Sequence, residues 1–327
     1  MRTSPELRHL GSSGLTVSVV GPGCNNLGRP RCATQTLEGS QLVVDAALEA
    51  GITFFDVADV YGAVPGLSEE ILGRTLGTRR ADVVVATKFG MDMDGGNGAD
   101  LGARGSRRYI LTSVEASLRR LGTDWIDLYQ FHTPDAGTPI EETLSALDTL
   151  VTSGKVRYIG HSNRAGWQIA EAELVARQLG TERFVSAQNH YNLLDRRAEL
   201  EVVPAASAYG LGLLPYFPLA NGLLTGKYAA SGGPADGRIT HSKPALLESA
   251  PWEALDRYSA FARERDLTEV EVAFSWLAAQ PVVASVIAGA TRPEQVVQNA
   301  AAVHPLTPAD LAELDAIFPA PGKIALF

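Results

Sequence analysis

The stretch ITFFDVADVYG, from Ile52 to Gly62, joins a short apolar run to a carboxylate and a phenol. Residues Ile52 to Phe55 are β-branched or aromatic, which is typical of a buried strand. Asp56 ends this run, and Tyr61 follows in a short loop. In a barrel of parallel strands, loops at the carboxyl ends of the strands hold polar groups over a rigid apolar scaffold. Asp56 and Tyr61 are therefore candidate active-site residues, although a helix-capping aspartate and a structural tyrosine would leave the same pattern.

Strand-like runs of this kind recur along the chain and alternate with helical patterns. A small hairpin is predicted around Gly11 to Gly14, and eight predicted strands follow: Val17 to Val20, Ile52 to Phe55, Val83 to Ala86, Ile126 to Gln130, Val156 to Ile159, Phe184 to Ala187, Gly212 to Pro215 and Val283 to Ala288. Regular alternation implies parallel strands joined by crossover helices, and eight such units favour a closed barrel. We predict an α/β fold of one domain over residues 1–327, a (β/α)8 TIM barrel with an N-terminal β-hairpin and extra C-terminal helical segments.

The connections between the predicted strands are of two kinds. Most are amphipathic helices such as Tyr109 to Leu121, whose apolar residues fall on one face and which Gly122 is expected to end. Two segments are longer: Met91 to Arg108 is rich in Gly and Asp, and Asn221 to Ser249 is rich in Gly, Ser and Pro. Loops of this length in a compact domain are usually lids or binding segments.

Composition and charge restrict the class of protein. The 327 residues are 45% hydrophobic and 20% charged, which is ordinary for a globular chain. A formal net charge of -9 argues against nucleic acid or an anionic membrane as the main partner. Cys24 and Cys32 are the two cysteines, and their spacing suggests neither a disulfide framework nor a metal site. The amino terminus lacks an apolar signal core, and we expect a soluble, cytoplasmic protein.

Two further polar residues follow neighbouring predicted strands. Lys88 comes at the end of VVVATKFG, and His132 comes at the end of DLYQFH. Each taken alone is more often a solvated lysine or a satisfied histidine. If the barrel is correct, however, Asp56, Tyr61, Lys88 and His132 face one cleft, because the carboxyl ends of parallel strands meet at one edge.

These four side chains together suit acid catalysis. A lysine between a carboxylate and a phenol favours the tyrosinate, while the carboxylate keeps the ammonium group charged. A free phenol titrates near ~10, so an unassisted tyrosine is a poor proton donor to a developing alkoxide. The chemistry that uses a phenolic acid beside a histidine is carbonyl reduction.

On these residues the sequence resembles the aldo-keto reductase family along nearly its whole length. The family's Asp, Tyr, Lys and His tetrad matches Asp56, Tyr61, Lys88 and His132. The forms of GLLTGKY and PEQVVQN are most similar to the bacterial and potassium-channel β-subunit branch. The resemblance implies that Tyr61 is the general acid, that Lys88 and Asp56 tune it, and that His132 orients the carbonyl group.

The resemblance also implies a nicotinamide cofactor, NADP(H), and a set of residues that contact it. GHSN, SAQNHYNLLDR, PYFPLANGLLTGKY and IAGATRPEQVVQN carry this set: Ser162, Asn163, Gln188, Tyr216, Leu219, Lys227, Gly289, Thr291, Arg292, Gln295 and Asn299. Two positions depart from the family pattern, since Val57 replaces a threonine and Phe217 replaces a serine that commonly helps to hold the pyrophosphate. TRPE, from Thr291 to Glu294, also reads as a simple capping box that needs no ligand.

The function expected from the resemblance is reversible, metal-free reduction of an aldehyde or ketone to an alcohol with NADP(H). The expected partner is a small-molecule carbonyl substrate, whose identity the loops do not reveal, and the sequence leaves a homo-oligomer open. Two other functions stay open as well. One is a nucleotide-sensing regulatory subunit of the channel β-subunit type with slow turnover, and the other is a Schiff-base aldolase that uses Lys88.

Overall fold

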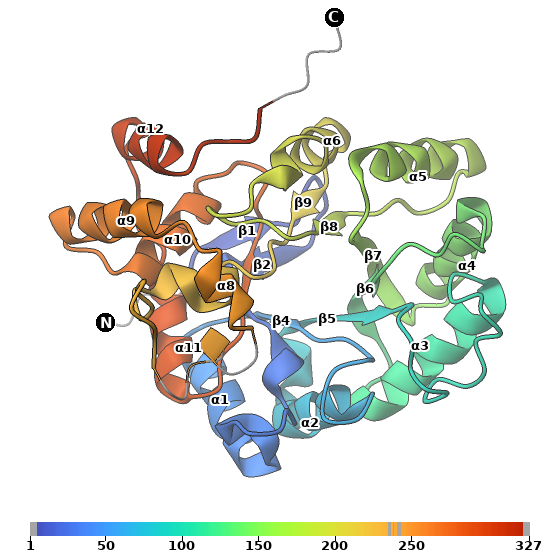
Figure 1. The fold of residues 1–327 in the computed structure, drawn as a ribbon. Helices are drawn as coiled ribbons and strands as arrows, with labels where there is room; N and C mark the ends of the chain where they lie inside the picture. Colours follow the sequence, from blue (N-terminus) through green and yellow to red (C-terminus); the bar gives the residue numbers. More distant parts are fainter. Residues whose placement is uncertain (1–4, 235–236, 238, 241–242, 323–327) are drawn as a thin grey trace, which may run out of the picture.

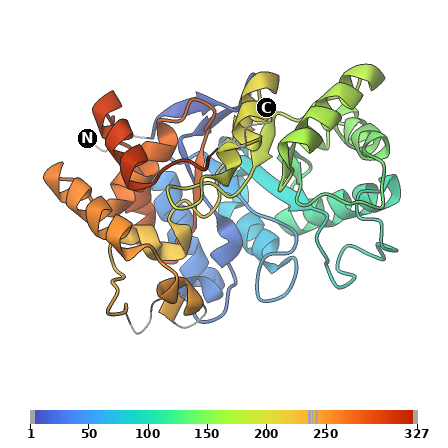
Figure 2. The same ribbon diagram turned by 45° about the horizontal axis from the view of Figure 1, so that its top comes forward.

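The computed structural model describes residues 5–234, 237, 239–240 and 243–322. Parallel strands form its centre, and Figures 1 and 2 show the helices arranged around the outside of these strands. The strands are β1 (Leu7–His9), β2 (Thr16–Ser18), β3 (Val20–Pro22), β4 (Phe54–Asp56), β5 (Val84–Phe89), β6 (Ile126–Phe131), β7 (Val156–Ser162), β8 (Ser186–Gln188), β9 (Gly212–Leu213) and β10 (Val286–Ala288).

Helices connect successive parallel strands, two further helices follow the last strand, and together they lie around the outside of the strands. They are α1 (Leu37–Glu49), α2 (Leu67–Leu76), α3 (Arg107–Leu121), α4 (Ile140–Thr152), α5 (Gly166–Leu179), α6 (Val202–Tyr209), α8 (Ala245–Glu248), α9 (Trp252–Glu264), α10 (Glu269–Ala278), α11 (Pro293–Ala300) and α12 (Pro308–Ile317). Along the described ranges, none of these helices is both long and apolar enough to cross a bilayer.

The strands form two parallel ladders. β4 to β9 make a six-stranded sheet in chain order, and β10 pairs with β3 in a separate parallel ladder. Isolated parallel bridges join the ladders at both sides, between Gly23 and Asp56 and between Leu213 and Val283. The prediction of an α/β fold with a parallel sheet is confirmed, and the bridge at Asp56 lies at the carboxyl end of β4.

The predicted amino-terminal hairpin is confirmed. β1 and β2 pair in antiparallel fashion, with Arg8 opposite Val17. Leu10 and Val17 are fully buried in an apolar cluster with inward residues of the strands, among them Phe54 and Leu128. The hairpin therefore covers the inside of the sheet with apolar side chains, and the polar site lies further along the strands.

The predicted helix from Tyr109 to Leu121 is also confirmed. α3 starts after Ser106, whose side chain accepts a hydrogen bond from the Tyr109 N–H, and the helix ends before Gly122. Gly122 has φ 62°, a left-handed conformation that a residue without Cβ adopts at little cost. The residues of the predicted apolar face are buried: Ile110, Val114, Leu118 and Leu121.

Several strand boundaries differ from the predictions. The run from Val17 to Val20 is not one strand, because β2 ends at Ser18 and β3 begins at Val20. Ser18 Oγ donates a hydrogen bond to the Val20 carbonyl at 2.8 Å, which stabilises the bend between them. The central strands β5, β6 and β7 are longer than predicted, whereas β8, β9 and β10 are shorter. Lys88 consequently lies within β5.

Candidate active site

Lys88 and Asp56 form a buried ion pair at the carboxyl end of the sheet. Lys88 Nζ donates to Asp56 Oδ2 at 2.7 Å and to the Val57 carbonyl at 2.9 Å. The side chain of Lys88 is 0% exposed and that of Asp56 is 4% exposed. β4 and β5 are adjacent and in register, which explains why two residues 32 positions apart meet here.

Tyr61 and His132 lie beside this pair. Lys88 Nζ is 5.0 Å from the centroid of the Tyr61 ring. The ring centroids of Tyr61 and His132 are 5.8 Å apart and their planes are inclined by 86°. Tyr61 is only half-buried, so a molecule at the edge of the sheet can reach it. The structure thus brings the four predicted side chains together in one place.

Burial and charge set the protonation states of the acid pair. Burial raises the pKa of Tyr61 above its ordinary value, and the positive charge of Lys88 opposes that rise without cancelling it. Burial alone would lower the pKa of Lys88, but Asp56 and Tyr61 together outweigh burial, and the pKa is raised. At neutral pH the site therefore holds a protonated phenol beside an ammonium group. A Schiff-base lysine needs the opposite, an amine with a lowered pKa.

His132 is neutral in this environment. Burial, assisted by the positive charge of Lys88, lowers the pKa of His132 to about 3. Its carbonyl oxygen accepts a hydrogen bond from Asn163 Nδ2 at 3.0 Å, which fixes the backbone at the end of β6. A neutral imidazole can donate one N–H to a substrate oxygen without competing with Tyr61 for the role of acid.

We predict that His132 does not titrate between about pH 5 and about pH 8, because its lowered pKa lies below that range. Nitrogen-detected NMR of the histidine rings measures this directly, and His132→Gln assigns the signal by its loss. The exposed His9, the last residue of β1, serves as an internal comparison. A His132 signal that moves to the charged form near pH 6.5 contradicts the assignment.

Residues expected at the nicotinamide also lie together. Ser162 ends β7, Gln188 ends β8, and Asn163 follows Ser162 in a left-handed conformation with φ 58°. Asn163 Nδ2 donates to Ser162 Oγ at 3.0 Å, and Tyr216 donates its hydroxyl proton to Asn163 Oδ1 at 2.8 Å. Ser162 Oγ in turn donates to the Gln188 carbonyl at 2.7 Å. Amide and hydroxyl groups in this arrangement suit a carboxamide, and the half-buried ring of Tyr216 offers a flat apolar surface.

Gln188 has a second contact, which it shares with a residue that the sequence analysis did not single out. Gln188 Nε2 and Gln130 Nε2 donate to the same oxygen, Asp56 Oδ1, at 2.9 Å and 3.2 Å. Gln130 is 0% exposed. It precedes His132 by two positions and so shares a strand face with it, and this spacing is the signal that could have identified it.

The residues expected at the adenosine end belong to the segment from β10 into α11. Gly289 and Thr291 lie between these elements, Arg292 precedes the first helical residue Pro293, and Gln295 and Asn299 lie on α11. The guanidinium group of Arg292 is exposed and makes no hydrogen bond or ion pair with the residues that the structure describes. It is therefore available to a ligand.

The capping box read from TRPE is wrong. The helix cap is Arg292 rather than Thr291, and no side chain caps the helix. Instead, Gln295 Oε1 accepts a hydrogen bond from the Thr291 N–H at 2.8 Å. Pro293 fixes the helix start one residue later than the predicted box requires, because proline favours the first helical position.

The segment expected at the pyrophosphate lies between β9 and α8. Leu219 is half-buried, and Lys227 is exposed with Nζ 5.3 Å from the centroid of the Tyr228 ring. Phe217 has φ 54°, and its carbonyl accepts a hydrogen bond from Asn192 Nδ2 at 2.8 Å. The phenyl side chain at position 217 is thus held in a strained turn, and its backbone is already bonded. Part of the predicted second long segment, residues 235–236, 238 and 241–242, lies outside the described residues.

The predicted long loop before α3 is anchored by a buried asparagine. Asn97 is 2% exposed, and its Nδ2 donates to Asp59 Oδ2 at 2.8 Å. Arg120 Nη2 donates to Asn97 Oδ1 at 2.9 Å, and Arg120 Nε donates to Glu69 Oε2 at 2.7 Å. Asp59 lies two residues before Tyr61, so this network joins the loop to the segment that carries the phenol.

This loop also encloses an open cleft of about 340 Å³. Its lining includes the charged residues Asp92, Asp100 and Arg104 and the larger side chains of Met93, Leu101 and Tyr109. Arg104 forms ion pairs with both Asp92 and Asp100.

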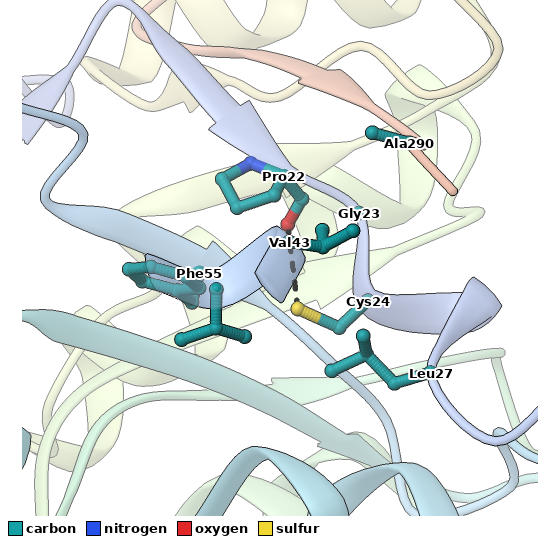
Figure 3. A pocket seen from close by; sticks show the side chains of 8 residues that line it. Pro22, Gly23, Cys24, Leu27, Val43, Phe55 and Ala290 are labelled. Carbon is teal, nitrogen blue, oxygen red and sulfur yellow. Dashed lines mark hydrogen bonds between the residues drawn. The ribbon is translucent and has the colours of Figure 1, made fainter. Parts of the chain in front are cut away.

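Cys24 lines a small cavity together with Leu27 and Phe55 (Figure 3). The cavity has a volume of about 10 Å³, which is at most room for one water molecule. Cys24 Sγ donates weakly to the Pro22 carbonyl at 3.7 Å. Burial, together with the negative charge of Asp56, raises the pKa of the Cys24 thiol well above its usual value. Cys24 is therefore an apolar packing residue and a poor nucleophile.

Comparison with known proteins identifies the family of this chain. The family model described as Aldo/keto reductase family matches residues 20–318. The chain is 39% identical to the uncharacterized oxidoreductase YrpG of Bacillus subtilis strain 168, over 97% of each chain. It is 34% identical to L-glyceraldehyde 3-phosphate reductase of Escherichia coli strain K12, over 95% of this chain and 91% of the relative. It is 36% identical to a probable voltage-gated potassium channel subunit beta of Oryza sativa subsp. japonica, over 95% and 96%. The resemblance predicted from the sequence is confirmed, and the chain belongs to the aldo/keto reductase family.

Proposed function

We propose that this protein reduces an aldehyde or ketone to an alcohol, reversibly, with NADP(H) as hydride donor. Family membership and oxidoreductase relatives imply carbonyl reduction in general terms. The observation that supports the specific mechanism is the cluster at the sheet edge, where Lys88 bonds to Asp56 at 2.7 Å and lies 5.0 Å from the Tyr61 ring centroid. We further propose that the two ladders close into the family's (β/α)8 barrel as one domain, placed in the cytoplasm.

Each residue of the cluster has a distinct task in this proposal. A nicotinamide cofactor, when bound, supplies a hydride to the carbonyl carbon. Tyr61 donates its phenolic proton to the carbonyl oxygen, and the charge of Lys88 stabilises the tyrosinate that remains. Asp56 keeps Lys88 charged and in place, and neutral His132 donates a hydrogen bond that orients the carbonyl group.

The residues present fit a dinucleotide. Ser162, Asn163 and Gln188 offer amide and hydroxyl groups for a carboxamide, and Tyr216 offers a ring for stacking. Leu219 and Lys227 follow on the next segment, and Arg292 is an exposed cation at the amino terminus of α11. Gly289, Thr291, Gln295 and Asn299 complete the proposed adenosine end.

The proposal is tested with a panel of aldehydes, ketones and keto sugars, scored by the loss of NADPH absorbance. At least one carbonyl class should be reduced with stoichiometric oxidation of NADPH and no added metal. A wild-type protein that binds NADPH but oxidises it no faster with any carbonyl than without would contradict the proposed reaction. Borohydride with a carbonyl substrate separately tests the aldolase, which predicts a covalent adduct at Lys88.

Cofactor preference yields a further prediction. Arg292→Ala should raise the Kd for NADPH about 10- to 150-fold, because one partly exposed contact to a phosphate is worth roughly 1.5 to 3 kcal/mol. NADH binding should hardly change, and the salt dependence of NADPH binding should flatten. Titration of both cofactors by protein fluorescence measures these values.

Arg119→Ala is the matched control, because Arg119 is another exposed arginine near the end of α3. The assignment of NADP(H) is abandoned if the wild-type protein binds NADH as tightly as NADPH at physiological ionic strength. If Arg292→Ala still prefers NADPH over NADH as strongly as the wild type does, another residue must contact the phosphate.

A second function has one observation in its favour, the similarity to a probable channel subunit beta over nearly the full chain. In that case the protein senses the redox state of the nucleotide, binds the cofactor tightly and turns over slowly. Single-turnover kinetics separates the two: an enzyme releases product and repeats, whereas a sensor completes hydride transfer once and retains the oxidised cofactor. Self-association, which either function allows, is measured by light scattering.

A further inference from the structure

Gln130 lies in a row of inward positions that crosses the sheet through the ion pair. In the register of the ladders, Lys88 of β5 is opposite Gln130 of β6, Gln130 is opposite Gly160 of β7, and Gly160 is opposite Ser186 of β8. The side chains of Lys88, Gln130 and Ser186 are all 0% exposed. A glutamine directly beside the buried lysine is therefore enclosed by the sheet and has no access to solvent.

Gly160 makes the space that this row needs. A Cβ atom at position 160 would lie 2.1 Å from Ser186 Oγ and 3.2 Å from Gln130 Cγ. Any larger residue would displace one of these side chains. Because Gly160 of β7 has no side chain, the side chain of Gln130 has the space that it needs to reach Asp56.

The carboxylate of Asp56 receives hydrogen bonds on both oxygens. Oδ2 accepts from Lys88 at 2.7 Å, and Oδ1 accepts from Gln188 at 2.9 Å and from Gln130 at 3.2 Å. A carboxylate at 3% exposure needs such donors, because burial without them favours the neutral acid. Two amides on one oxygen also prevent rotation of the carboxylate away from Lys88.

The two amides differ in their second partner. Gln188 belongs to the group of residues proposed to meet the cofactor, where its Oε1 can accept from a carboxamide. Gln130 Oε1, in contrast, has no hydrogen-bond partner among the described residues. The bond to Asp56 is thus the polar contact that accounts for a glutamine at position 130.

We infer that Gln130 is a positioning residue of the proposed reaction: its amide fixes Asp56, and through Asp56 it holds Lys88 charged and beside Tyr61. The inference rests on the proposed function for its effect on turnover, but its geometric part can be tested without it. Among the described residues, the side chain of Gln130 has its hydrogen bond with Asp56 and none with Tyr61 or His132.

The first test is Gln130→Met, which keeps the length of the side chain and removes its polar atoms. We expect kcat to fall about ten-fold at every pH, because Asp56 loses one of its donors, while the Kd for NADPH stays within about two-fold. Ser186→Ala is the matched control, since Ser186 is buried in the same row and its Oγ has no partner among the described residues. It should retain wild-type kcat.

Gln130→Glu provides a signature that loss of packing cannot produce. Burial and the charge of Asp56 favour the neutral form of the introduced carboxyl group, whose O–H can replace the amide as donor to Oδ1. Near pH 5 kcat should therefore approach the wild-type value. As the pH rises to about 8 the group ionises, two carboxylates face each other, and kcat should fall at least ten-fold.

The groups around Asp56 do not interfere with this reading. None of them titrates between about pH 5 and about pH 8. The pKa values of Lys88, Tyr61 and Cys24 are raised and lie above this range, and the pKa of His132 is lowered and lies below it. A new basic limb in Gln130→Glu accordingly belongs to position 130.

Equilibrium unfolding in urea tests the geometry without cofactor or substrate. A group whose folded pKa is raised stabilises fully below its unfolded pKa and loses that contribution as pH rises through the folded value. The urea midpoint of Gln130→Glu should therefore fall relative to Gln130→Met from about pH 5 to about pH 8. In an Asp56→Asn background this fall should shrink, because the facing charge is gone.

The outcomes separate the inference from the proposed function. If the wild-type protein turns over no carbonyl, the proposed function is rejected. If the urea midpoint of Gln130→Glu nevertheless falls with pH as expected, the contact of Gln130 with Asp56 is retained. Turnover in the wild type with unchanged kcat in Gln130→Met, or a flat pH profile in Gln130→Glu, overturns the inference. So does a pH-dependent fall in the urea midpoint that is equally large in the Asp56→Asn background.

Discussion

Tyr61→Phe is expected to reduce turnover by at least about 10²-fold while NADPH binding stays within a factor of about two. Removal of the hydroxyl group takes away the proton donor, and general acid catalysis of this kind contributes typically 10²–10⁴-fold. The ring remains, so its contacts with Lys88 and His132 are kept. Stopped-flow measurement of NADPH oxidation, combined with fluorescence titration of the cofactor, distinguishes a loss of chemistry from a loss of binding.

Tyr158→Phe is the control for this experiment. Tyr158 is half-buried on β7, and a Cβ atom added to Gly14 of the hairpin would lie 3.6 Å from its hydroxyl oxygen, at the other end of the strands. Its removal should leave kcat unchanged. Near-normal kcat in Tyr61→Phe with a good substrate would require a different proton donor.

Lys88→Met is expected to abolish most turnover and to destabilise the fold. The substitution leaves the Asp56 carboxylate buried without its cation, and breaking a buried pair in this way costs typically 3–5 kcal/mol. The double variant Asp56→Asn/Lys88→Met should recover part of that loss, because no buried charge remains. Urea unfolding of the single and double variants measures both effects.

The pH dependence of this stability difference has a definite sign. The folded pKa of Lys88 is raised, so its contribution is fully present below the unfolded lysine value of about 10.4. It is lost only as the pH rises through the folded value. The difference between wild type and Lys88→Met should thus be constant through neutral pH and shrink in strong alkali. Lys155→Met, at an exposed ion pair with Glu115, should cost less than about 1 kcal/mol.

The type and order of the elements could be predicted from the sequence because each has a local cause. Ile52 to Phe55 is a continuous run of β-branched and aromatic residues, the α3 face is an apolar pattern with a period of 3.6, and Gly122 ends a helix by its backbone alone. Strand ends were less predictable. β9 is only two residues long, although the predicted run was longer. The length of a strand depends on how far the neighbouring strands extend beside it, and the residues of the run itself do not specify this.

The candidate site, too, could be predicted from the sequence only in part. Asp56, Tyr61, Lys88 and His132 could be placed together because each follows or ends a strand, and the carboxyl ends of parallel strands converge. Gln130 ends a predicted strand and shares a face with His132, but neither its partner nor that of Asn97 in the long loop could be found in this way. Their importance depends on contacts with residues 74 and 38 positions away, respectively, and only the folded chain reveals those partners.

The anchor at Asn97 has a consequence for redesign of this protein. It divides the loop between β5 and α3 into two arms, one on each side of a point fixed to Asp59 and Arg120. When sequence changes are confined to either arm, the segment that carries Tyr61 should keep its position, whatever the length of the loop. Libraries that randomise or lengthen the arms but retain Asn97 should therefore yield many folded variants with altered substrate range, whereas transplanting the whole loop without its asparagine should yield few.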